Sequence, residues 1–400
     1  MALEQIFISI VILLAGARLL GELFRRVKQP ALGGELLAGI ILGPTIFGIV
    51  KPDESLDMLS TIAIFFVMLF IGLEMDIREI KRAGKAAFVI SIISLTIPFF
   101  VGYQLGVFFG FSLIESLFVA LLLSVTSVPV SAMILMELGV LKTKIGTTVM
   151  SAAVVDDIIT LLILAVILQL HSTGGTSVDV AQVGISTGQM AIYLAGIAFL
   201  VFAMYKMNRW FPLRLESFFA KAKTKEAVFG IFIVVAITLS LAAQLAGLHF
   251  IIGTFFAGLI FSEKIVGKKE SDRAYGVMSG ITFGFFAPLF FAILGMKFSG
   301  QSLENSILFL VSLVVLGILG KTLGGYIGAK ICGISKDQSL AIATLLNGRG
   351  TVGLAITALA YSIGILDLTL FSICIAICFA TTIITPIIAR PLLRKIAATE

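Results

Sequence analysis

The sequence predicts an all-α polytopic membrane protein with thirteen transmembrane helices, forming two inverted six-helix repeats with crossed broken helices. Three observations support this prediction: an apolar composition, an alternation of basic charge between loops, and an internal repeat. Of the 400 residues, 59% are hydrophobic and 13% are charged, whereas soluble domains carry about 25% charged residues. Helices suit so apolar a chain, because each helix pairs its own backbone polar groups inside lipid.

Thirteen apolar segments define the expected helices in chain order. The first continues past Leu20 with no small-residue cleavage site, so we expect it to remain as a helix. The second contains Gly33, Gly34, Gly39 and Gly43, which predicts close packing against another helix. The segments cover residues 4–24, 31–50, 57–75, 86–110, 113–138, 146–170, 187–207, 226–246, 249–263, 281–296, 304–329, 338–362 and 366–389.

Basic residues alternate between the gaps that separate these segments. The odd-numbered gaps and the C-terminal tail hold 24 of the 29 Lys and Arg residues, and the opposite gaps hold only Lys51 and Lys297. Because cytoplasmic loops carry the excess of basic residues, we expect a multi-pass protein of the inner (plasma) membrane. Its N-terminus would lie outside and its C-terminus in the cytoplasm. The net charge of +6 then reflects loop charge, and we expect no nucleic-acid partner.

The chain repeats itself at an offset of 219 to 223 residues. Segments seven apart in order cross the membrane in opposite directions, so the repeat is inverted, an architecture typical of transporters. We expect residues 1–186 and 226–400 to form the two halves, and residues 187–225 to form a linker helix and a cytoplasmic loop. The matching stretches are 34–41 with 253–260, 65–70 with 285–290, and Gly102-Tyr103 with Gly325-Tyr326.

Two segments in opposite halves contain residues that interrupt a helix. A proline removes a backbone donor from segment 113–138, and two glycines weaken segment 338–362. Paired interrupted helices are the best sequence indication of a transporter's binding site, although a proline kink and a flexible glycine pair would leave the same pattern. The residues expected to line the site are Thr126, Ser127, Pro129 and Ser131 in the first segment, and Asn347, Gly348, Arg349, Gly350 and Thr351 in the second.

Two adjacent carboxylates, Asp156 and Asp157, lie near the centre of segment 146–170. A charged group at the bilayer centre costs at least about 2.5–3.5 kcal/mol, so the pair indicates proton or cation handling. Successive helical residues point about 100° apart, so one carboxylate can face an ion path while the other faces a neighbouring helix. Alkali cations prefer oxygen ligands, which carboxylates, hydroxyls, freed carbonyls and water can supply.

Two basic residues lie deep inside later segments. Lys321 is central in segment 304–329, and a buried ammonium needs a partner or loses its proton. One of the two aspartates is the natural partner, and the residues alone leave open which one. Arg349 stays charged under ordinary conditions, so between the two breaks we expect it to compensate the ends of the broken helices.

These motifs together resemble the monovalent cation:proton antiporter-2 family. The resemblance covers nearly the whole chain, and it implies a homodimer whose protomers have a dimerisation domain and a core domain that moves like an elevator. It also implies that Asp157 binds the ion, here Na⁺, that Asp156 pairs with Lys321, and that exchange is electrogenic. The motifs are Gln29-Pro30 with Gly34-Glu35, Leu37 to Gly39 and Leu42 to Pro44; Leu69 to Asp76; Ala153 to Asp157; and Gly320-Lys321 with Gly324-Gly325.

The chain departs from the family pattern at Thr351, where many members carry an acidic residue. The chain also ends soon after the last segment, so we expect no nucleotide-binding regulatory domain like that of the potassium-efflux relatives. Because Thr351 stands where many members carry an acidic residue, any role of that carboxylate is in doubt for this chain.

The most favoured function is secondary-active sodium/proton antiport at the double aspartate. No phosphate loop, nucleotide fingerprint or nucleophile triad is visible, so we expect a transporter driven by an ion gradient, with no enzyme activity and no cofactor. The main alternative is a potassium/proton antiporter or a Kef-like potassium-efflux protein, and the sequence does not separate Na⁺ from Li⁺ or K⁺. A potassium channel, an intramembrane aspartyl protease and a sodium/organic-anion symporter are weaker alternatives.

Overall fold

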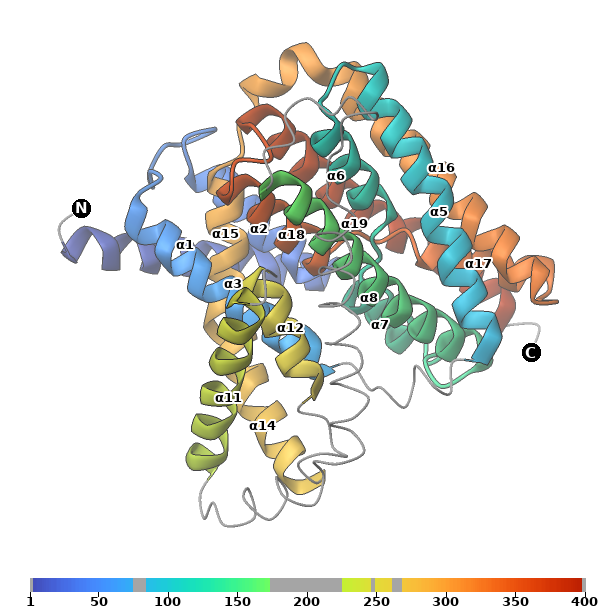
Figure 1. Ribbon diagram of the computed structural model, residues 1–400, viewed down its shortest axis with the longest axis horizontal. Coiled ribbons are helices and arrows are strands. Elements are labelled where there is room, and N and C mark those ends of the chain that lie inside the picture. Colours follow the sequence, from blue (N-terminus) through green and yellow to red (C-terminus); the bar gives the residue numbers. More distant parts are fainter. Residues whose placement is uncertain (1–2, 75–83, 173–224, 246–248, 261–267, 398–400) are drawn as a thin grey trace. The chain divides into compact units, whose positions relative to one another are not determined.

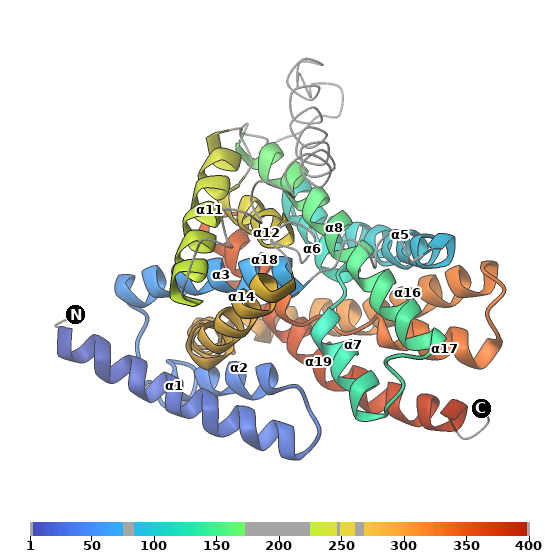
Figure 2. The ribbon, with the colours of Figure 1, turned by 90° about the horizontal axis from the view of Figure 1, so that it is seen from below.

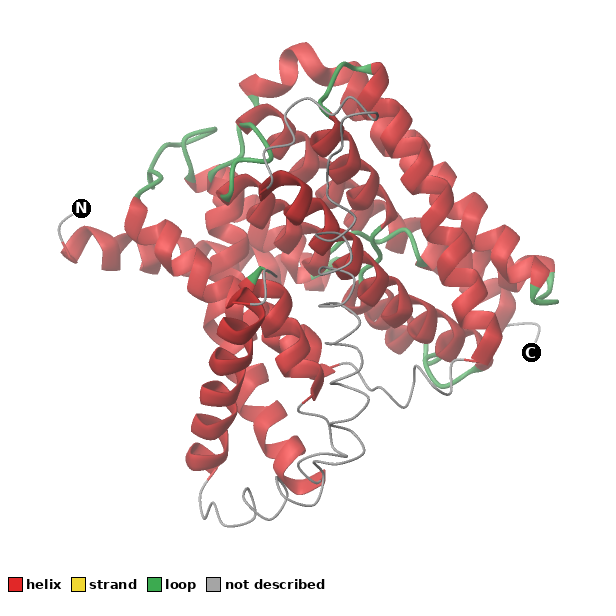
Figure 3. Ribbon diagram, viewed as in Figure 1, coloured by secondary structure: helices red, strands yellow, loops and turns green. Residues whose placement is uncertain are grey.

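The computed structural model describes residues 3–74, 84–172, 225–245, 249–260 and 268–397. Every regular element in these ranges is a helix (Figure 3). The helices in the first half are α1 (Leu3–Arg26), α2 (Ala31–Leu42), α3 (Glu54–Glu74), α5 (Gly84–Phe108), α6 (Leu113–Ser124), α7 (Val128–Glu137) and α8 (Lys144–Ser172). Those in the second half are α11 (Lys225–Leu245), α12 (Phe250–Ile260), α14 (Lys268–Ile281), η1 (Thr282–Phe286), α15 (Ala287–Met296), η2 (Gln301–Ser306), α16 (Ile307–Ile331), α17 (Lys336–Leu345), α18 (Thr351–Ser362) and α19 (Leu368–Ala397).

The predicted all-helical membrane architecture is confirmed. Within the described residues, eight helical stretches are long and apolar enough to cross a membrane, and several shorter apolar helices accompany them. Each predicted segment except 187–207 coincides with one helix or with a pair of consecutive helices. The segment 187–207 lies outside the described residues.

Three predicted boundaries were wrong. Segment 366–389 continues as α19 to Ala397. Segment 31–50 is helical only to Leu42, because a proline at position 44 disfavours helical geometry at Gly43. Segment 281–296 belongs to an apolar stretch that starts at Tyr275 and contains a π-helical turn, η1. Pro288 follows that turn; it lacks a backbone donor, and its ring would clash with the carbonyl four residues earlier.

The chain forms two compact units, and each unit draws on both sequence halves. One comprises residues 1–60, 80–164 and 288–400, and the other comprises residues 61–79 and 165–287. All residues expected at the ion site belong to the first unit. The division into a dimerisation domain and a core domain stays a prediction.

In the first unit, α5 and α16 lie side by side over much of their length (Figure 1 and Figure 2). Glycines on α16 allow the two backbones to approach closely. A Cβ atom at Gly324 would lie 2.6 Å from the carbonyl oxygen of Ile93, and one at Gly328 would lie 2.8 Å from Cα of Ile90. This packing holds Lys321 of α16 beside the segments that carry the breaks.

Glycine contacts also tie each half to the other at equivalent positions. In the first unit, Gly39 of α2 lies against the carbonyl of Ala292 in α15, and Gly295 lies against the carbonyl of Leu36. In the second unit, Gly258 of α12 lies against the carbonyl of Leu69 in α3, and Gly72 lies against that of Phe255. The two pairs correspond at an offset of 219 residues for α2 with α12 and of 223 residues for α3 with α15, so the packing corrects the offset of 220 that the match of 65–70 with 285–290 predicts. The predicted close packing of the glycine-rich second segment is therefore confirmed at Gly39.

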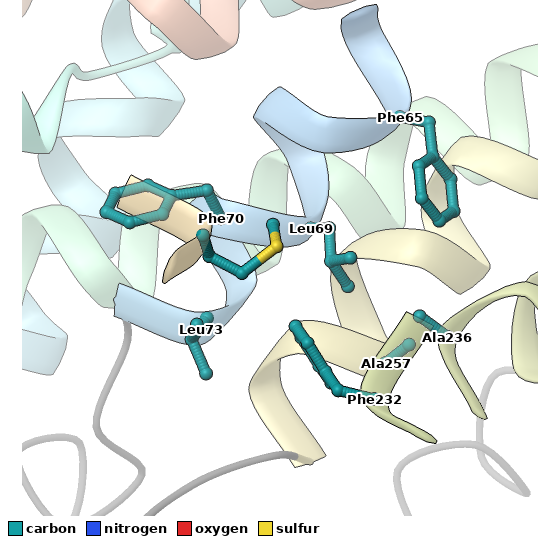
Figure 4. Packing of buried hydrophobic residues seen from close by; sticks show 8 residues of the cluster. Phe65, Leu69, Phe70, Leu73, Phe232, Ala236 and Ala257 are labelled. Atoms are coloured by element: carbon teal, nitrogen blue, oxygen red, sulfur yellow. The ribbon is translucent and has the colours of Figure 1, made fainter. Parts of the chain in front are cut away.

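An aromatic and aliphatic core holds the second unit together (Figure 4). Phe232 of α11 is fully buried, and it packs in one cluster with the apolar face of α3. Because lipid is as apolar as these side chains, the cluster stabilises the unit through van der Waals contacts between its helices. The buried members of the cluster are Phe65, Leu69, Phe70, Leu73, Phe232, Ala236, Ala257 and Met278.

We expect Gly39→Val to lower stability by about 1–3 kcal/mol, because its side chain would collide with the Ala292 carbonyl. Thermal unfolding of the purified protein in detergent measures this loss. The matched control is Gly280→Val in α14, where a Cβ atom would meet nothing within 4 Å. Equal unfolding temperatures for the two variants would contradict the packing argument.

Candidate functional site

The first helix break separates α6 from α7. Residues 125–127 leave helical geometry between the end of α6 at Ser124 and the start of α7 at Val128. Pro129 occupies the first turn of α7, where its missing N–H costs nothing because that donor has no partner inside the helix. Inside a continuous helix a proline would leave the carbonyl four residues earlier without its donor, so Pro129 favours the start of a new helix here.

The second break separates α17 from α18. The first helix ends at Leu345 and the second begins at Thr351, so residues 346–350 connect them. Both breaks occur where the sequence predicts them. All nine predicted lining residues lie at these two interruptions, and all except the partly exposed Pro129 are buried.

The two breaks contact each other directly. The backbone N–H of Ser127 donates to the carbonyl of Gly348 at 2.7 Å. The hydroxyl of Thr126 lies 3.1 Å from the carbonyl oxygen of Leu346, and the hydroxyl of Ser131 donates to that of Leu345 at 2.8 Å. Gly350 lies against the Ser127 side chain, where a Cβ atom would not fit. The broken helices therefore cross at their interruptions.

Arg349 and Lys321 satisfy the carbonyl groups at the C-terminal end of α6. The Leu121 carbonyl receives the N–H of Val125. The Arg349 guanidinium donates from Nε to the Leu122 carbonyl at 3.1 Å and from Nη2 to the Leu123 carbonyl at 2.5 Å. Lys321 Nζ donates to the Ser124 carbonyl. A helix C-terminus carries a partial charge of roughly −0.5, so two fixed cations neutralise this buried end.

Asp156 is held by three donors from separate parts of the chain. Lys321 Nζ on α16 and the Thr126 hydroxyl at the first break each lie 2.5 Å from Oδ2. The hydroxyl of Ser91 on α5 donates to Oδ1 at 3.3 Å. All four side chains have 0% exposure, so a buried ion pair with two supporting hydroxyl groups occupies the crossing.

Asp157 is also fully buried, with both carboxylate oxygens shielded from solvent. The helical period turns it about 100° away from Asp156. Thr160 follows three residues later and is also fully buried; that spacing places it on the same side of α8 as Asp157. The adjacent carboxylates thus have different surroundings within one helix.

Ser91 and Thr382 are site residues that the sequence reasoning missed. Ser91 holds Asp156, and the Thr382 hydroxyl donates to the Arg349 carbonyl at 2.8 Å. Each is a small polar residue in an otherwise apolar segment, a common occurrence in membrane helices. Their burial and their hydrogen bonds identify them as site residues, and both depend on how the helices pack.

The sequence pattern of the family described as sodium/hydrogen exchanger, transmembrane, matches residues 9–395. This match confirms the cation/proton antiporter family expected from the motifs. It spans both helix breaks, the double aspartate and the buried lysine.

Individual relatives match over nearly their whole length. The chain is 29% identical over 393 residues to a Na⁺/H⁺ antiporter of Enterococcus hirae, covering 98% of this chain and 99% of that protein. It is 28% identical over 384 residues to the Na⁺/H⁺-K⁺ antiporter GerN of Bacillus cereus, covering 96% and 95%. The solved structure of the sodium proton antiporter MjNhaP1 from Methanocaldococcus jannaschii shares the fold, with a TM-score of 0.67 and 17% identity over 97% of this chain and 98% of that chain.

We expect Arg349→Met to destabilise the protein by about 3 kcal/mol, because it leaves at least two buried carbonyl groups of α6 without a donor. The loss is measured as a lower unfolding temperature in detergent. Arg26→Met is the control, because that side chain is 75% exposed. An unchanged unfolding temperature for Arg349→Met would show that the α6 end does not depend on this side chain.

Proposed function

The chain belongs to the transmembrane sodium/hydrogen exchanger family, and we propose that it is a secondary-active antiporter that exchanges Na⁺ for H⁺. The observation that carries the proposal is the fully buried double aspartate beside the crossing of two broken helices, with one aspartate paired to a lysine. Asp157, the adjacent and fully buried carboxylate on the same helix, is the one that we assign to the mobile ion. Na⁺ and H⁺ are cargo, and the exchange needs no resident cofactor.

Asp157 is the carrier in this proposal. A buried carboxylate is costly in its charged form unless a cation accompanies it. It therefore holds either a proton or a cation, and the two compete for the same oxygens. Because the empty, charged state is disfavoured, the carrier crosses the membrane occupied, and this requirement couples the two fluxes.

Asp156 and Lys321 form the neighbouring charge pair. Their opposite charges compensate each other at 2.5 Å, so we assign the exchange of a proton for the cation to Asp157. Replacing one proton by one Na⁺ at Asp157 is electrically neutral. Electrogenic exchange therefore requires the Asp156–Lys321 pair to release a further proton when the cation arrives.

The alternating exposure of this site is proposed to follow an elevator-like movement of a core domain within a homodimer. The crossing is tied together by backbone and hydroxyl hydrogen bonds between the two breaks, which favours movement as one body. A second candidate is potassium/proton exchange, which the similarity to the Na⁺/H⁺-K⁺ antiporter GerN supports. Li⁺ is a further candidate cargo, because it is also a hard monovalent cation that prefers oxygen ligands.

We expect Asp157→Asn to abolish cation-driven proton flux in proteoliposomes, because a neutral amide cannot alternate between proton and cation. Flux is followed with a pH-sensitive dye on addition of Na⁺, Li⁺ or K⁺ at several pH values, with and without an imposed voltage. These arms identify the ion and the electrogenicity together.

The matched control for that experiment is Asp367→Asn. Asp367 is exposed and accepts the N–H of Leu370 at the start of α19, and asparagine serves equally well at such a position. The control should keep the wild-type flux. Normal flux from Asp157→Asn would overturn the proposed carrier.

We also propose that the N-terminus lies outside and the C-terminus in the cytoplasm, as the loop charges indicate. Lys51→Cys and Lys142→Cys place thiols at exposed positions in opposite gaps. A membrane-impermeant maleimide on intact cells should label the first, and it should label the second only after permeabilisation. The parent protein with its three native cysteines sets the background, and the reverse labelling order would invert the topology.

A further inference from the structure

The two crossed helices end in electrically different ways. The end of α6 is held by the cations Lys321 and Arg349. The last four carbonyls of α17 instead receive neutral donors: the N–H of Leu346, the side-chain and backbone N–H groups of Asn347, and the hydroxyl of Ser131. The partial negative charge of a helix C-terminus is thus matched by fixed cations at α6 and by neutral groups at α17.

Leu346 follows the end of α17, and its buried carbonyl has a shared donor. The Thr126 hydroxyl lies 3.1 Å from this carbonyl oxygen and 2.5 Å from Oδ2 of Asp156. A threonine hydroxyl carries one proton, so it donates to one of these two oxygens at a time. Whenever it donates to Asp156, the Leu346 carbonyl loses the donor that Thr126 provides.

Further oxygen atoms at the crossing are buried without a hydrogen bond from any other described residue. They are the Ser127 hydroxyl, the Asn347 amide oxygen and the Thr351 hydroxyl. They belong to residues directly following Thr126 and Leu346 and to the first residue of α18. A buried polar atom without a protein partner indicates a bound water or ion, and hard monovalent cations prefer oxygen ligands.

We propose that the Leu346 carbonyl is a ligand of the transported cation, and that the Thr126 hydroxyl controls its availability by turning between Leu346 and Asp156. With the cation bound, the hydroxyl donates to Asp156 and the carbonyl faces the cation. With the cation absent, the hydroxyl returns to the carbonyl and satisfies it. Thr126 is therefore a positioning residue, and this inference rests on the proposed cation exchange.

The charged groups around this hydroxyl come from three elements. Asp156 and Asp157 belong to α8, Lys321 to α16, and Arg349 to the second break. The two cations are committed to α6 carbonyls and, for Lys321, to Asp156. The end of α17 has neutral donors and no fixed cation among the described residues, so it attracts an additional positive charge.

Thr126→Val tests the proposal, because it preserves the shape of the side chain and removes the hydroxyl. In the cation-bound state Asp156 loses the Thr126 donor but keeps Lys321 and Ser91. In the empty state the Leu346 carbonyl loses the donor that Thr126 provides and is left unsatisfied. The variant should therefore unfold at a lower temperature. It should also show an apparent KM for Na⁺ about 5- to 10-fold lower, because the unsatisfied buried carbonyl destabilises only the empty state and so favours cation binding. Flux and Na⁺-dependent thermal shifts are measured at alkaline pH, where proton competition is weakest.

Two variants separate this effect from simple structural damage. Thr126→Ser keeps a hydroxyl and should return the KM towards the wild-type value. Thr357→Val removes a buried hydroxyl that donates to the Gly353 carbonyl within α18, so it should lower stability without changing the KM. If Thr126→Val does not fold, Thr126→Cys replaces it, because a thiol is only a weak donor, and the same direction is expected.

The outcomes distinguish this inference from the proposed function. If the wild-type protein shows no cation-driven proton flux, the proposed function fails. If the wild type transports and the Thr126 variant has an unchanged or higher KM for Na⁺, the Leu346 carbonyl is not a ligand and this inference alone is overturned.

Discussion

The structure depends on the neutralisation of a helix end buried at the centre of an apolar protein. The broken α6 ends with three carbonyl groups that no residue of its own helix satisfies, and Arg349 and Lys321 donate to all three. An uncompensated polar group in such surroundings costs several kcal/mol. These two cations make the break possible, and the break makes room for the aspartates.

The same lysine links the fold to the proposed chemistry. Lys321 contacts both the end of α6 and Asp156. A change in the charge of Asp156 therefore alters the electrostatic interaction of an ammonium that also donates to the end of α6. The α6 carbonyl would keep the ammonium in place if Asp156 changed its partner. Structural support and ion coupling therefore share one side chain, and the close packing of α5 against α16 positions it.

The internal repeat is symmetric in packing and asymmetric in charge. The glycine contacts of α2 with α15 correspond residue by residue to those of α12 with α3, so the inherited backbone arrangement is the same in both halves. The two crossed ends differ, because fixed cations hold one and neutral donors hold the other. In the proposed mechanism this difference leaves the end of α17 able to attract a mobile cation, because the negative end of a helix dipole favours positive charge.

Much of this protein follows from the sequence alone. Apolar length and period determine the helices, Pro129 and the glycines beside Arg349 determine the breaks, and two adjacent charges in one apolar helix mark the site. Only the tertiary structure decides that Asp156 is the partner of Lys321, that Ser91 and Thr382 belong to the site, and that Thr126 lies between two acceptors. The helical period separates the two aspartates but does not say which neighbour each one meets. Those contacts join residues up to 220 positions apart, and their distances depend on how glycine-lined helices pack.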